Sequence, residues 1–390
     1  MTKEKGIPQI RFSGFTDTWE QRELGEVVKE VTRNDSTSEA PIMMITANNG
    51  FIEQSERYAF NNAGESLKKY ILLEKGELAY NHGASKLRPY GSCFALTTAE
   101  NARIPFVYHC FSVENQNAEF MSIELNSSEI ENQLRKIVSS GARMDGLLNI
   151  SFDEYSSVSV VLPSIEEQDR IAGFLRNLDR LITLHQRKYD KLTKVKKAML
   201  EKMFPENGSP YPEIRFKGFT DAWEQRKLGD IASDMVAGGD IDKDLILAEG
   251  QYPVIANALT GDGIVGYYDK EYRVNAPAVT VTGRGDVGHA KARLVNFTPV
   301  VRLLSVKSEH DVFFLENVIN TLKIVIESTG VPQLTVPQLA KYEVAFPRQL
   351  DEEEHIGAFF KQLDHLITLH QRKLEKLKNI KKACLEKMFV

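Results

Sequence analysis

The chain repeats two of its own segments, and this repetition restricts the folds open to it more than any other feature. Residues 8–27 and 212–231 are identical at 14 of 20 positions, at an offset of 204. Residues 165–204 and 350–389 are identical at 23 of 40 positions, at an offset of 185. The stretches between them, 28–164 and 232–349, show little similarity to each other. Because only these pieces recur, and only twice, a solenoid of short repeats is excluded.

The order of the repeats predicts a pseudo-two-fold molecule. The first long repeat ends at Phe204 and runs on into the second short repeat, whereas the second long repeat ends at Phe389, one residue before the end of the chain. Joining the two ends would therefore give a closed circle of two units. Two near-identical units in one chain favour the arrangement of a homodimer. We expect the two ends of the chain to lie close together.

Each long repeat has the apolar spacing of a single long helix. Seam residues recur at intervals of three and four, which is typical of a heptad helix. Acidic residues begin each segment and lysines end it, as the helix dipole favours. About 35–40 residues at ~1.5 Å each make a helix of roughly 55–60 Å. A seam of this kind needs a partner, and the simplest one is the other copy, packed antiparallel. The predicted interface consists of Ile171, Leu175, Leu178, Ile182, His185, Leu192, Ile356, Phe360, Leu363, Ile367, His370, Leu374 and Leu377.

Two features of the long repeats allow more than one interpretation. His185 and His370 are predicted to be hydrogen-bonded residues at the boundary of the seam, with metal binding or pH sensing as the alternative. The run Gln186–Lys188 recurs as Gln371–Lys373. It is either a solvated face or a surface for a partner protein, since helix propensity alone does not require both copies to keep it.

The variable inserts are predicted to be mixed α/β domains. Both end alike, with a helix, a Ser/Thr-Gly loop, an extended run and a proline before the long repeat, which indicates one fold with diverged loops. The predicted strands are Tyr70–Leu73, Phe106–Phe111, Ala278–Thr282 and Val300–Val306, and the predicted helices are Ser128–Val138 and Phe313–Ser328. The predicted divisions are a first domain at 1–164, a central helix at 165–204, a second domain at 205–349 and a distal helix at 350–390.

Two strings in the second insert match the pattern G-x-G-x-x-G, at Gly261–Gly266 and Gly283–Gly288. A dinucleotide site requires a strand before this pattern and a helix after it, so that the helix N-terminus meets the pyrophosphate. The residues that follow both strings alternate as strands do. We therefore interpret both as hairpin turns.

Candidate DNA-binding residues gather in one loop of each insert. The net charge of −5 gives no global field that would attract phosphates, so a DNA partner would need local basic loops. Arginine and lysine pair with guanine edges or phosphates, and asparagine pairs with adenine. The candidates in these loops are Asn81, His82, Ser85, Lys86, Arg88, Tyr90, Thr282, Arg284, His289, Lys291 and Arg293. Arg143 and Gln333, just after the Ser/Thr-Gly loops, are further candidates.

Several classes of protein are excluded or disfavoured. No run of about 18 uncharged apolar residues is present, which excludes a membrane span. The N-terminus lacks the apolar stretch of a signal peptide, so we expect the cytoplasm. Cys93, Cys110 and Cys384 are too far apart for a disulfide scaffold or a cysteine-rich zinc site. No Walker A, H-E-x-x-H, G-x-S-x-G or Asp/Asn-Pro-Pro-aromatic string occurs, so the chain is expected to have no catalytic role.

The layout resembles the specificity subunit of type I restriction–modification enzymes. The features that carry the resemblance are the openings Phe12–Gly25 and Phe216–Gly229 and the helical runs Ile182–Lys188 and Ile367–Lys373. The likeness covers essentially all 390 residues. It implies two α/β (α+β) target recognition domains joined by two long antiparallel coiled-coil helices, with a pseudo-two-fold internal repeat.

The resemblance also implies a function. Each variable domain would read one half of a bipartite, asymmetric DNA site in the major groove. The helix pair would set the unread spacer and dock two methyltransferase subunits that methylate adenine N6, and motor-nuclease subunits would join them. S-adenosylmethionine, ATP and Mg²⁺ would belong to those partners, with no cofactor bound by this chain. The alternatives are a non-DNA scaffold with a helical dimerisation rod and a stand-alone enzyme.

Overall fold

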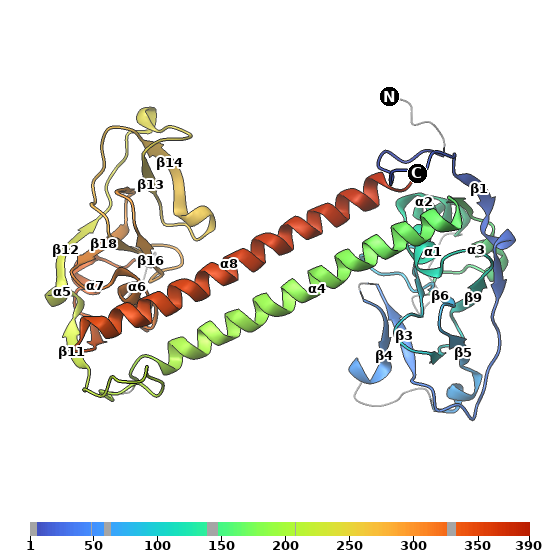
Figure 1. Cartoon of the computed structure of the whole chain (residues 1–390), viewed down its shortest axis with the longest axis horizontal. Helices are drawn as coiled ribbons and strands as arrows, with labels where there is room; N and C mark the ends of the chain where they lie inside the picture. The colour runs from blue at the N-terminus through green and yellow to red at the C-terminus, as the bar shows by residue number, and fades with distance from the viewer. Residues whose placement is uncertain (1–5, 48, 58–63, 139–146, 207, 326–332) are drawn as a thin grey trace. The chain divides into compact units, whose positions relative to one another are not determined.

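The computed structural model describes the whole chain except residues 1–5, 48, 58–63, 139–146, 207 and 326–332. The chain folds into two compact units. The first unit comprises Met1–Thr183 and Glu375–Val390, and the second comprises Leu184–Leu374. Each unit contains one variable insert together with part of both long helices (Figure 1). The four-part division predicted from the repeats follows sequence similarity and stays a prediction.

The first unit is built on a four-stranded antiparallel sheet with the strand order β2-β9-β6-β7. Three two-stranded pairs, β1-β10, β3-β4 and β5-β8, surround it. The strands are β1 Glu20–Glu23, β2 Val28–Glu30, β3 Met43–Thr46, β4 Gly50–Glu53, β5 Ile71–Glu74, β6 Leu78–Asn81, β7 Ser92–Ala95, β8 Asn101–Ile104, β9 His109–Val113 and β10 Ser159–Leu162. The short helices are α1 Ala118–Glu124, α2 Ser128–Ile137 and α3 Phe152–Ser156.

The second unit is built on a four-stranded antiparallel sheet with the order β12-β18-β15-β16. A three-stranded sheet, β14-β13-β17, and the pair β11-β19 complete it. The strands are β11 Glu224–Lys227, β12 Ala232–Ala237, β13 Tyr252–Ile255, β14 Ile264–Tyr268, β15 Ala278–Thr282, β16 Ala290–Arg293, β17 Thr298–Pro299, β18 Leu303–Ser308 and β19 Glu343–Phe346. The short helices are α5 Leu228–Ile231, α6 Val312–Asn320 and α7 Val336–Leu339.

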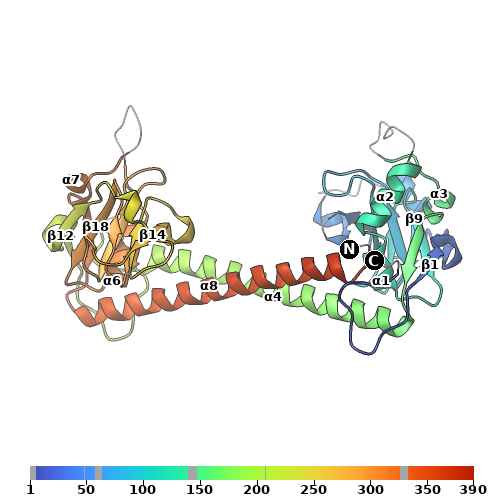
Figure 2. The same ribbon diagram turned by 90° about the horizontal axis from the view of Figure 1, so that it is seen from above.

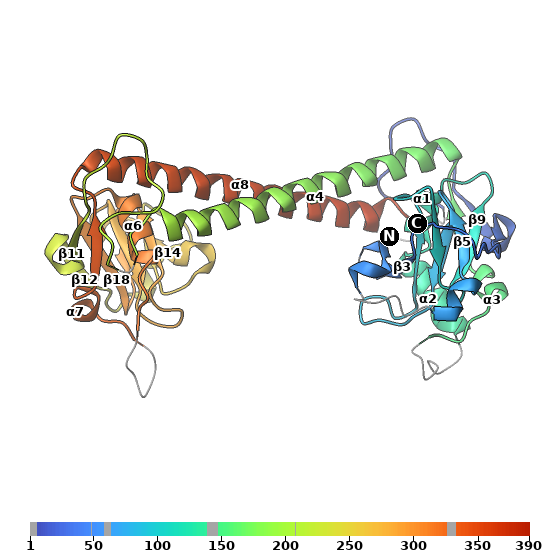
Figure 3. The same ribbon diagram turned by 90° about the horizontal axis from the view of Figure 1, so that it is seen from below.

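The two four-stranded sheets have the same topology. In each, the strand that follows the short repeat pairs with the last strand of the sheet, and a hairpin completes the order. One helix packs on the hairpin: α1 on β7, and α6 on β15 and β16 (Figures 2 and 3). Asn126, just after α1, accepts a hydrogen bond from the backbone N–H of Cys93 at 3.2 Å. Asn320, at the end of α6, accepts one from Ala290 at 2.9 Å. The prediction of one fold with diverged loops is therefore confirmed.

Some predicted element bounds differ from the structure. The predicted helix Phe313–Ser328 is wrong for residues 321–325, because the last turn tightens to bonds between residues three apart, with the Leu322 N–H donating to the Ile319 carbonyl at 3.0 Å. Residues 326–328 of that prediction lie outside the described ranges. The predicted strand Phe106–Phe111 begins only at His109, because a turn precedes it. The predicted strand Val300–Val306 is displaced to β18 for the same reason.

Each short repeat fastens the start of one long helix. Arg11 binds the carboxylate of Glu167 through two N–H groups, each at 2.7 Å, and Arg215 binds Glu352 in the same way at 2.6 and 2.7 Å. Both glutamates are in the first turn of a long helix, and both are 1 % exposed or less. A buried carboxylate needs such a partner, because an unpaired charge is costly away from water. Each short repeat therefore needs its arginine to pair with the buried glutamate of a long helix.

The same short repeats also meet the far end of the other long helix. The backbone N–H of Ile10 donates to the carbonyl of Lys387 at 2.9 Å, and that of Ile214 donates to the carbonyl of Lys202 at 2.8 Å. These bonds satisfy carbonyls that have no partner inside the helix. They also place the beginning and the end of the described chain side by side, as the order of the repeats predicts.

The long repeats form the helices α4 Ile165–Lys202 and α8 Leu350–Lys387, each of 38 residues. In the first unit, Lys381 pairs with Asp179 at 2.6 Å. In the second unit, Lys196 pairs with Asp364 at 2.6 Å, and these are the same two positions of the repeat with the helices exchanged. Residue numbers rise along α4 as they fall along α8, so the segments are antiparallel (Figures 1 and 2).

The first turns of the long helices belong to the cores of the two units. Ile171, Leu175 and Leu178 are buried with Trp19 and Phe389 in the first unit. Ile356, Phe360 and Leu363 are buried in the second unit, together with Trp223, Phe204 and Phe314. Farther along, Leu374 is buried, whereas Ile182, His185, Leu192, Ile367, His370 and Leu377 are half-buried. Within the described ranges, no helix combines the length and the apolar character that crossing a bilayer requires.

Candidate functional site

The two loops predicted to bind DNA occupy equivalent places. One joins β6 to β7 at 82–91, and the other joins β15 to β16 at 283–289. At the mouth of each loop the backbone N–H of a leucine donates to the strand: Leu148 to the carbonyl of His82, and Leu334 to that of Gly283, both at 2.9 Å. The frame of each unit therefore presents a different loop from the same point of the sheet.

The first loop presents two of its candidates to solvent. Ser85 and Lys86 are exposed. Arg88 is half-buried, and its Nη1 donates to the carbonyl of Asn126 at 2.8 Å. Tyr90 is also half-buried, and its carbonyl accepts from the Tyr80 hydroxyl at 2.6 Å. Arg88 and Tyr90 thus anchor the loop, and Lys86 is an exposed cation without a partner among the residues that the structure describes.

Asn81 and His82 hold the base of the first loop. His82 is 6 % exposed, and its two ring nitrogens lie 2.7 Å from the carbonyl oxygens of Leu148 and Val107. Asn81 accepts from the backbone N–H of Gly83 at 2.9 Å and donates through its amide to the Ile45 carbonyl at 3.1 Å. Neither ring nitrogen of His82 remains for a base, so the interpretation of His82 as a DNA contact is corrected to a structural role.

The second loop presents more cations. Arg284 is exposed, and its guanidinium has no partner among the described residues. His289 lies 3.1 Å from the carboxylate of Asp286, and Lys291, on β16, lies 4.0 Å from that of Asp262. All four groups of these two pairs are at least half exposed, so water screens the pairs. Arg284, His289 and Lys291 therefore remain available to a ligand.

The remaining candidates of the second loop support it. Thr282 is buried, its hydroxyl donates to the Asp286 carbonyl at 2.6 Å, and it accepts from the His289 N–H at 3.0 Å. Arg293 is half-buried, its Nε donates to the Thr280 hydroxyl at 3.0 Å, and burial lowers the pKa of its guanidinium. Thr282 is therefore corrected from a DNA contact to a structural residue. The string Gly283–Gly288 lies in the turn of the antiparallel β15–β16 hairpin, as predicted. The string Gly261–Gly266 begins in the turn of the antiparallel β13–β14 hairpin and ends on β14.

Two candidates were placed after the Ser/Thr-Gly loops. Arg143 lies outside the described residues. Gln333 is half-buried, and its Oε1 accepts from Nη1 of Arg302 at 2.7 Å. Gln333 also forms an isolated antiparallel bridge with Arg284, so the structure brings these two candidates together.

Sequence reasoning missed Asn257 and Arg302. Asn257 lies in the turn between β13 and β14, accepts from the Gly283 N–H at 2.9 Å and donates to the Val301 carbonyl at 3.1 Å. Arg302 lies in the turn between β17 and β18. A single sequence contains no signal for either, because both positions depend on three segments meeting.

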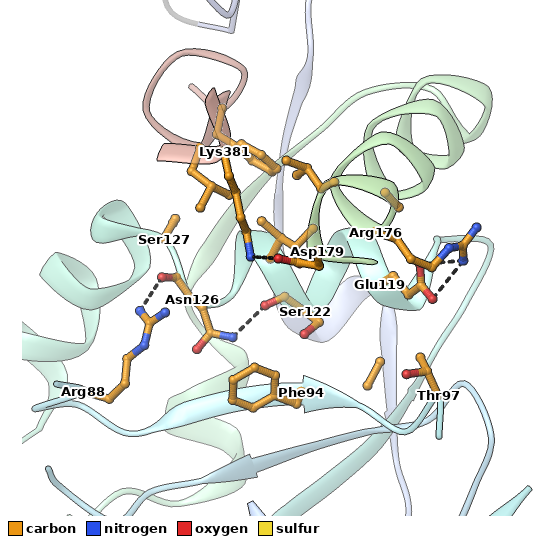
Figure 4. Close-up of a pocket in the computed structure, with 16 residues that line it drawn as sticks. Arg88, Phe94, Thr97, Glu119, Ser122, Asn126, Ser127, Arg176, Asp179 and Lys381 are labelled. Carbon is orange, nitrogen blue, oxygen red and sulfur yellow. Dashed lines mark hydrogen bonds and ion pairs between the residues drawn. The ribbon is translucent and has the colours of Figure 1, made fainter. Parts of the chain in front are cut away.

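A cavity of about 390 Å³ opens in the first unit between α1, β7 and the long helices (Figure 4). Its walls include Phe94, Ser122, Leu175, Leu385 and Phe389. Two ion pairs stand beside it, Arg176 with Glu119 at 2.8 Å and Lys381 with Asp179 at 2.6 Å. Its lining contains no histidine or cysteine. Over the described residues of the whole chain, no group of three or more metal-ligating side chains occurs.

The repeated helical run exposes apolar side chains. Leu184 and Leu369 occupy the same position in the two copies and are 45 % and 36 % exposed. Arg187 and Lys188, three and four residues beyond Leu184, are exposed beside it. Single exposed leucines are common on protein surfaces, so both interpretations of this run, a solvated face and a partner-protein surface, stay predictions.

Comparison with known proteins places the chain in a family. The family model described as type I restriction modification DNA specificity domain matches residues 16–194 and 220–379. A candidate type I specificity subunit of Mycoplasma pneumoniae is 25% identical over 90% of this chain and 88% of its own length. A candidate specificity subunit of the Methanocaldococcus jannaschii enzyme MjaX is 22% identical over 97% of this chain and 95% of its own length.

The fold agrees with this. The crystal structure of a type I restriction–modification S subunit from M. genitalium superposes with a TM-score of 0.65 at 13% sequence identity, covering 98% of this chain and 99% of that one. The family model matches twice, each match covers one variable insert and most of the long helix that follows it, and the two matches together take up most of the sequence. The chain therefore belongs to the specificity subunits of type I restriction–modification systems.

Proposed function

We propose that each unit reads one half of a bipartite, asymmetric DNA site. The observation that carries this proposal is that two sheets of the same strand order present dissimilar loops from the same point. The first loop offers Ser85 and Lys86 to a ligand, and the second offers Arg284, His289 and Lys291. Two different loops on one repeated frame suit two different half-sites rather than a palindrome.

The helix pair would set the unread spacer and dock the partner subunits. A continuous helix fixes a span that a flexible linker would blur, and half-sites about one helical turn apart, ~34–36 Å, lie on one face of DNA. Leu184 and Leu369, exposed in both copies of the repeated run, would contact two methyltransferase subunits. Through these, motor-nuclease subunits would join the complex.

The chemistry would belong to the partners. S-adenosylmethionine would serve the methyltransferases, and ATP and Mg²⁺ would serve the motor-nuclease, with adenine N6 methylated in each half-site. This chain would contribute recognition only. A subunit of this kind acts on DNA inside the cell, so we place it in the cytoplasm.

The test is to co-express the chain with its methyltransferase in a host that lacks other adenine methylation, and to sequence the modified genome. The expected result is one bipartite motif with N6-methyladenine in each half. Replacing residues 28–164 with the corresponding insert of another specificity subunit should change one half only. Unmodified DNA despite a stable complex would contradict the proposal, and so would a change in both halves.

A further inference from the structure

Arg302 has a backbone conformation that L-residues avoid. Its φ is +71°, in the left-handed region, in the turn between β17 and β18. The turn is held on both sides, because the Leu303 N–H donates to the Val300 carbonyl at 3.0 Å and Asn257 donates to the Val301 carbonyl at 3.1 Å. Strain at a residue that is not glycine persists only where its surroundings enforce it, and such residues cluster at functional sites.

Gly283 allows the close approach that fixes this turn. A Cβ at Gly283 would lie 2.2 Å from the carbonyl oxygen of Arg302 and 3.0 Å from that of Leu334. Both contacts are with backbone atoms, which cannot swing aside as a flexible side chain does. The β15–β16 loop, the β17–β18 turn and the strand-like run at Leu334 therefore meet at one point, and Gly283 is required there.

The side chain of Arg302 is oriented by Gln333. Nη1 of Arg302 donates to Oε1 of Gln333 at 2.7 Å, and both residues are half-buried. The other N–H groups of this guanidinium and the Nε2 of Gln333 have no partner within the described part of the chain. The free groups of the Arg302 guanidinium are all donors, as is Nε2 of Gln333, whereas Oε1 of Gln333 keeps one lone pair. Arg284, bridged to Gln333 through the backbone, adds an exposed cation beside them.

We propose that Arg302 reads a guanine in the second half-site and that Gln333 is its positioning residue. The proposal rests on the proposed function, which makes DNA the ligand of this surface. The guanidinium of Arg302 presents only hydrogen-bond donors. It therefore matches the major-groove edge of guanine, where O6 and N7 are both acceptors. A guanidinium already held by Oε1 of Gln333 would lose less freedom when it binds.

The first unit cannot make the same contact. The position equivalent to Arg302 is Val107, and the position equivalent to Gly283 is His82. There Nε2 of His82 lies 2.7 Å from the carbonyl oxygen of Val107. The side chain of valine has no hydrogen-bond donor. The inferred guanine contact is therefore specific to the half-site read by the second unit.

The experiment uses the full chain with its methyltransferase and maps methylation motifs by genome sequencing. Arg302→Ala should relax one guanine position of the second half-site, lowering the preference for guanine roughly tenfold or more. Arg302→Lys keeps the charge but not the fork, and should lose the same preference. Gln333→Ala should weaken the preference at that position only. The matched control is Arg226→Ala, an exposed arginine on β11, which should leave the motif unchanged.

Several results would overturn the inference. A second half-site without guanine would do so, as would an Arg302→Lys variant that keeps the full motif. A uniform fall in methylation with the motif unchanged would identify a phosphate contact instead. Melting temperatures separate misfolding from lost recognition, because Arg302→Lys is expected to melt with the parent protein. If the parent complex gave no sequence-specific methylation, the proposed function itself would be wrong, and not only the guanine contact assigned to Arg302.

Discussion

The Nδ1 atoms of His185 and His370 lie 2.8 Å apart, and the two histidines occupy the same position in the two long repeats. One ring must therefore donate and the other accept, although the local sequences are identical. Both histidines are therefore hydrogen-bonded, as the seam predicts, and the partner of each is the other copy. The pair exists only while at least one of the two rings is neutral.

The histidine pair predicts a loss of stability in acid. Burial, and then the charges of Lys373 and Lys188, lower the pKa of His185, and burial and the neighbouring His185 ring lower that of His370. Because the folded pKa is below the unfolded value of about 6.5, the unfolded chain binds more protons in this range. The contribution to stability is therefore complete above pH ~6.5 and is lost as the pH falls below it. Melting temperatures of the parent and of His185→Gln/His370→Gln between pH 5 and 8 should show a flatter profile for the variant. Parallel profiles would contradict this.

A buried carboxylate predicts the opposite dependence. Glu124 is 5 % exposed, and burial raises its pKa to about 7, although its Oε1 accepts from the Val161 N–H at 3.4 Å. The folded pKa lies above the unfolded value, so stability is complete below pH ~4.5 and is lost as the pH rises through 7. Glu124→Gln removes the titrating carboxyl group. The free energy of unfolding of the variant, measured relative to that of the parent, should therefore be roughly 3 kcal/mol higher at pH 8 than in acid. Denaturant midpoints at pH 5 and 8 measure it, and an equal pH dependence in both proteins would refute it.

The buried ion pairs of the short repeats predict large effects. Arg215→Met would leave Glu352 buried without its partner and should cost about 3–5 kcal/mol of unfolding free energy. The matched control is Arg348→Met, because its pair with Glu224 at 3.1 Å is more than half exposed on both sides and should be worth less than about 1 kcal/mol. Equal losses of unfolding free energy in Arg215→Met and Arg348→Met would show that the buried Arg215–Glu352 pair contributes no more to stability than the exposed pair.

The exposed cation of the second loop predicts a change in recognition. Arg284→Ala should weaken or relax the second half-site by about 1–3 kcal/mol if the residue contacts a base, and leave the first half-site unchanged. The measurement is the methylation motif and rate of the complex. Lys86→Ala is the corresponding variant of the first loop, and its effect should be confined to the other half-site.

The architecture could be predicted because its signals are repeated and periodic. The seam spacing predicts α4 and α8, and the shared ending of the inserts predicts two domains of one fold. The end of α6 could not be predicted in this way. Apolar residues such as Leu322 and Ile324 continue beyond Asn320 and still pack on the core, but they do so from extended chain.

The candidate site was harder to predict, because residue type does not reveal which groups are already satisfied. His82 and Thr282 are polar residues at the base of a loop, as a base contact would be, yet their polar atoms are bound to backbone carbonyls. Arg302 is the opposite case, because its surroundings and not its residue type distinguish it. It is one arginine among many until Gly283, Asn257 and Gln333 come together around it from distant parts of the chain.

The bonds from Ile10 to Lys387 and from Ile214 to Lys202 join each short repeat to the last residue of a long helix. The junction is therefore the same whichever insert lies beyond it. If each insert reads one half-site as proposed, recombination between the repeats would keep these two backbone bonds while it exchanges an insert, and a lineage would acquire a new DNA target in a single genetic event without first losing a folded protein.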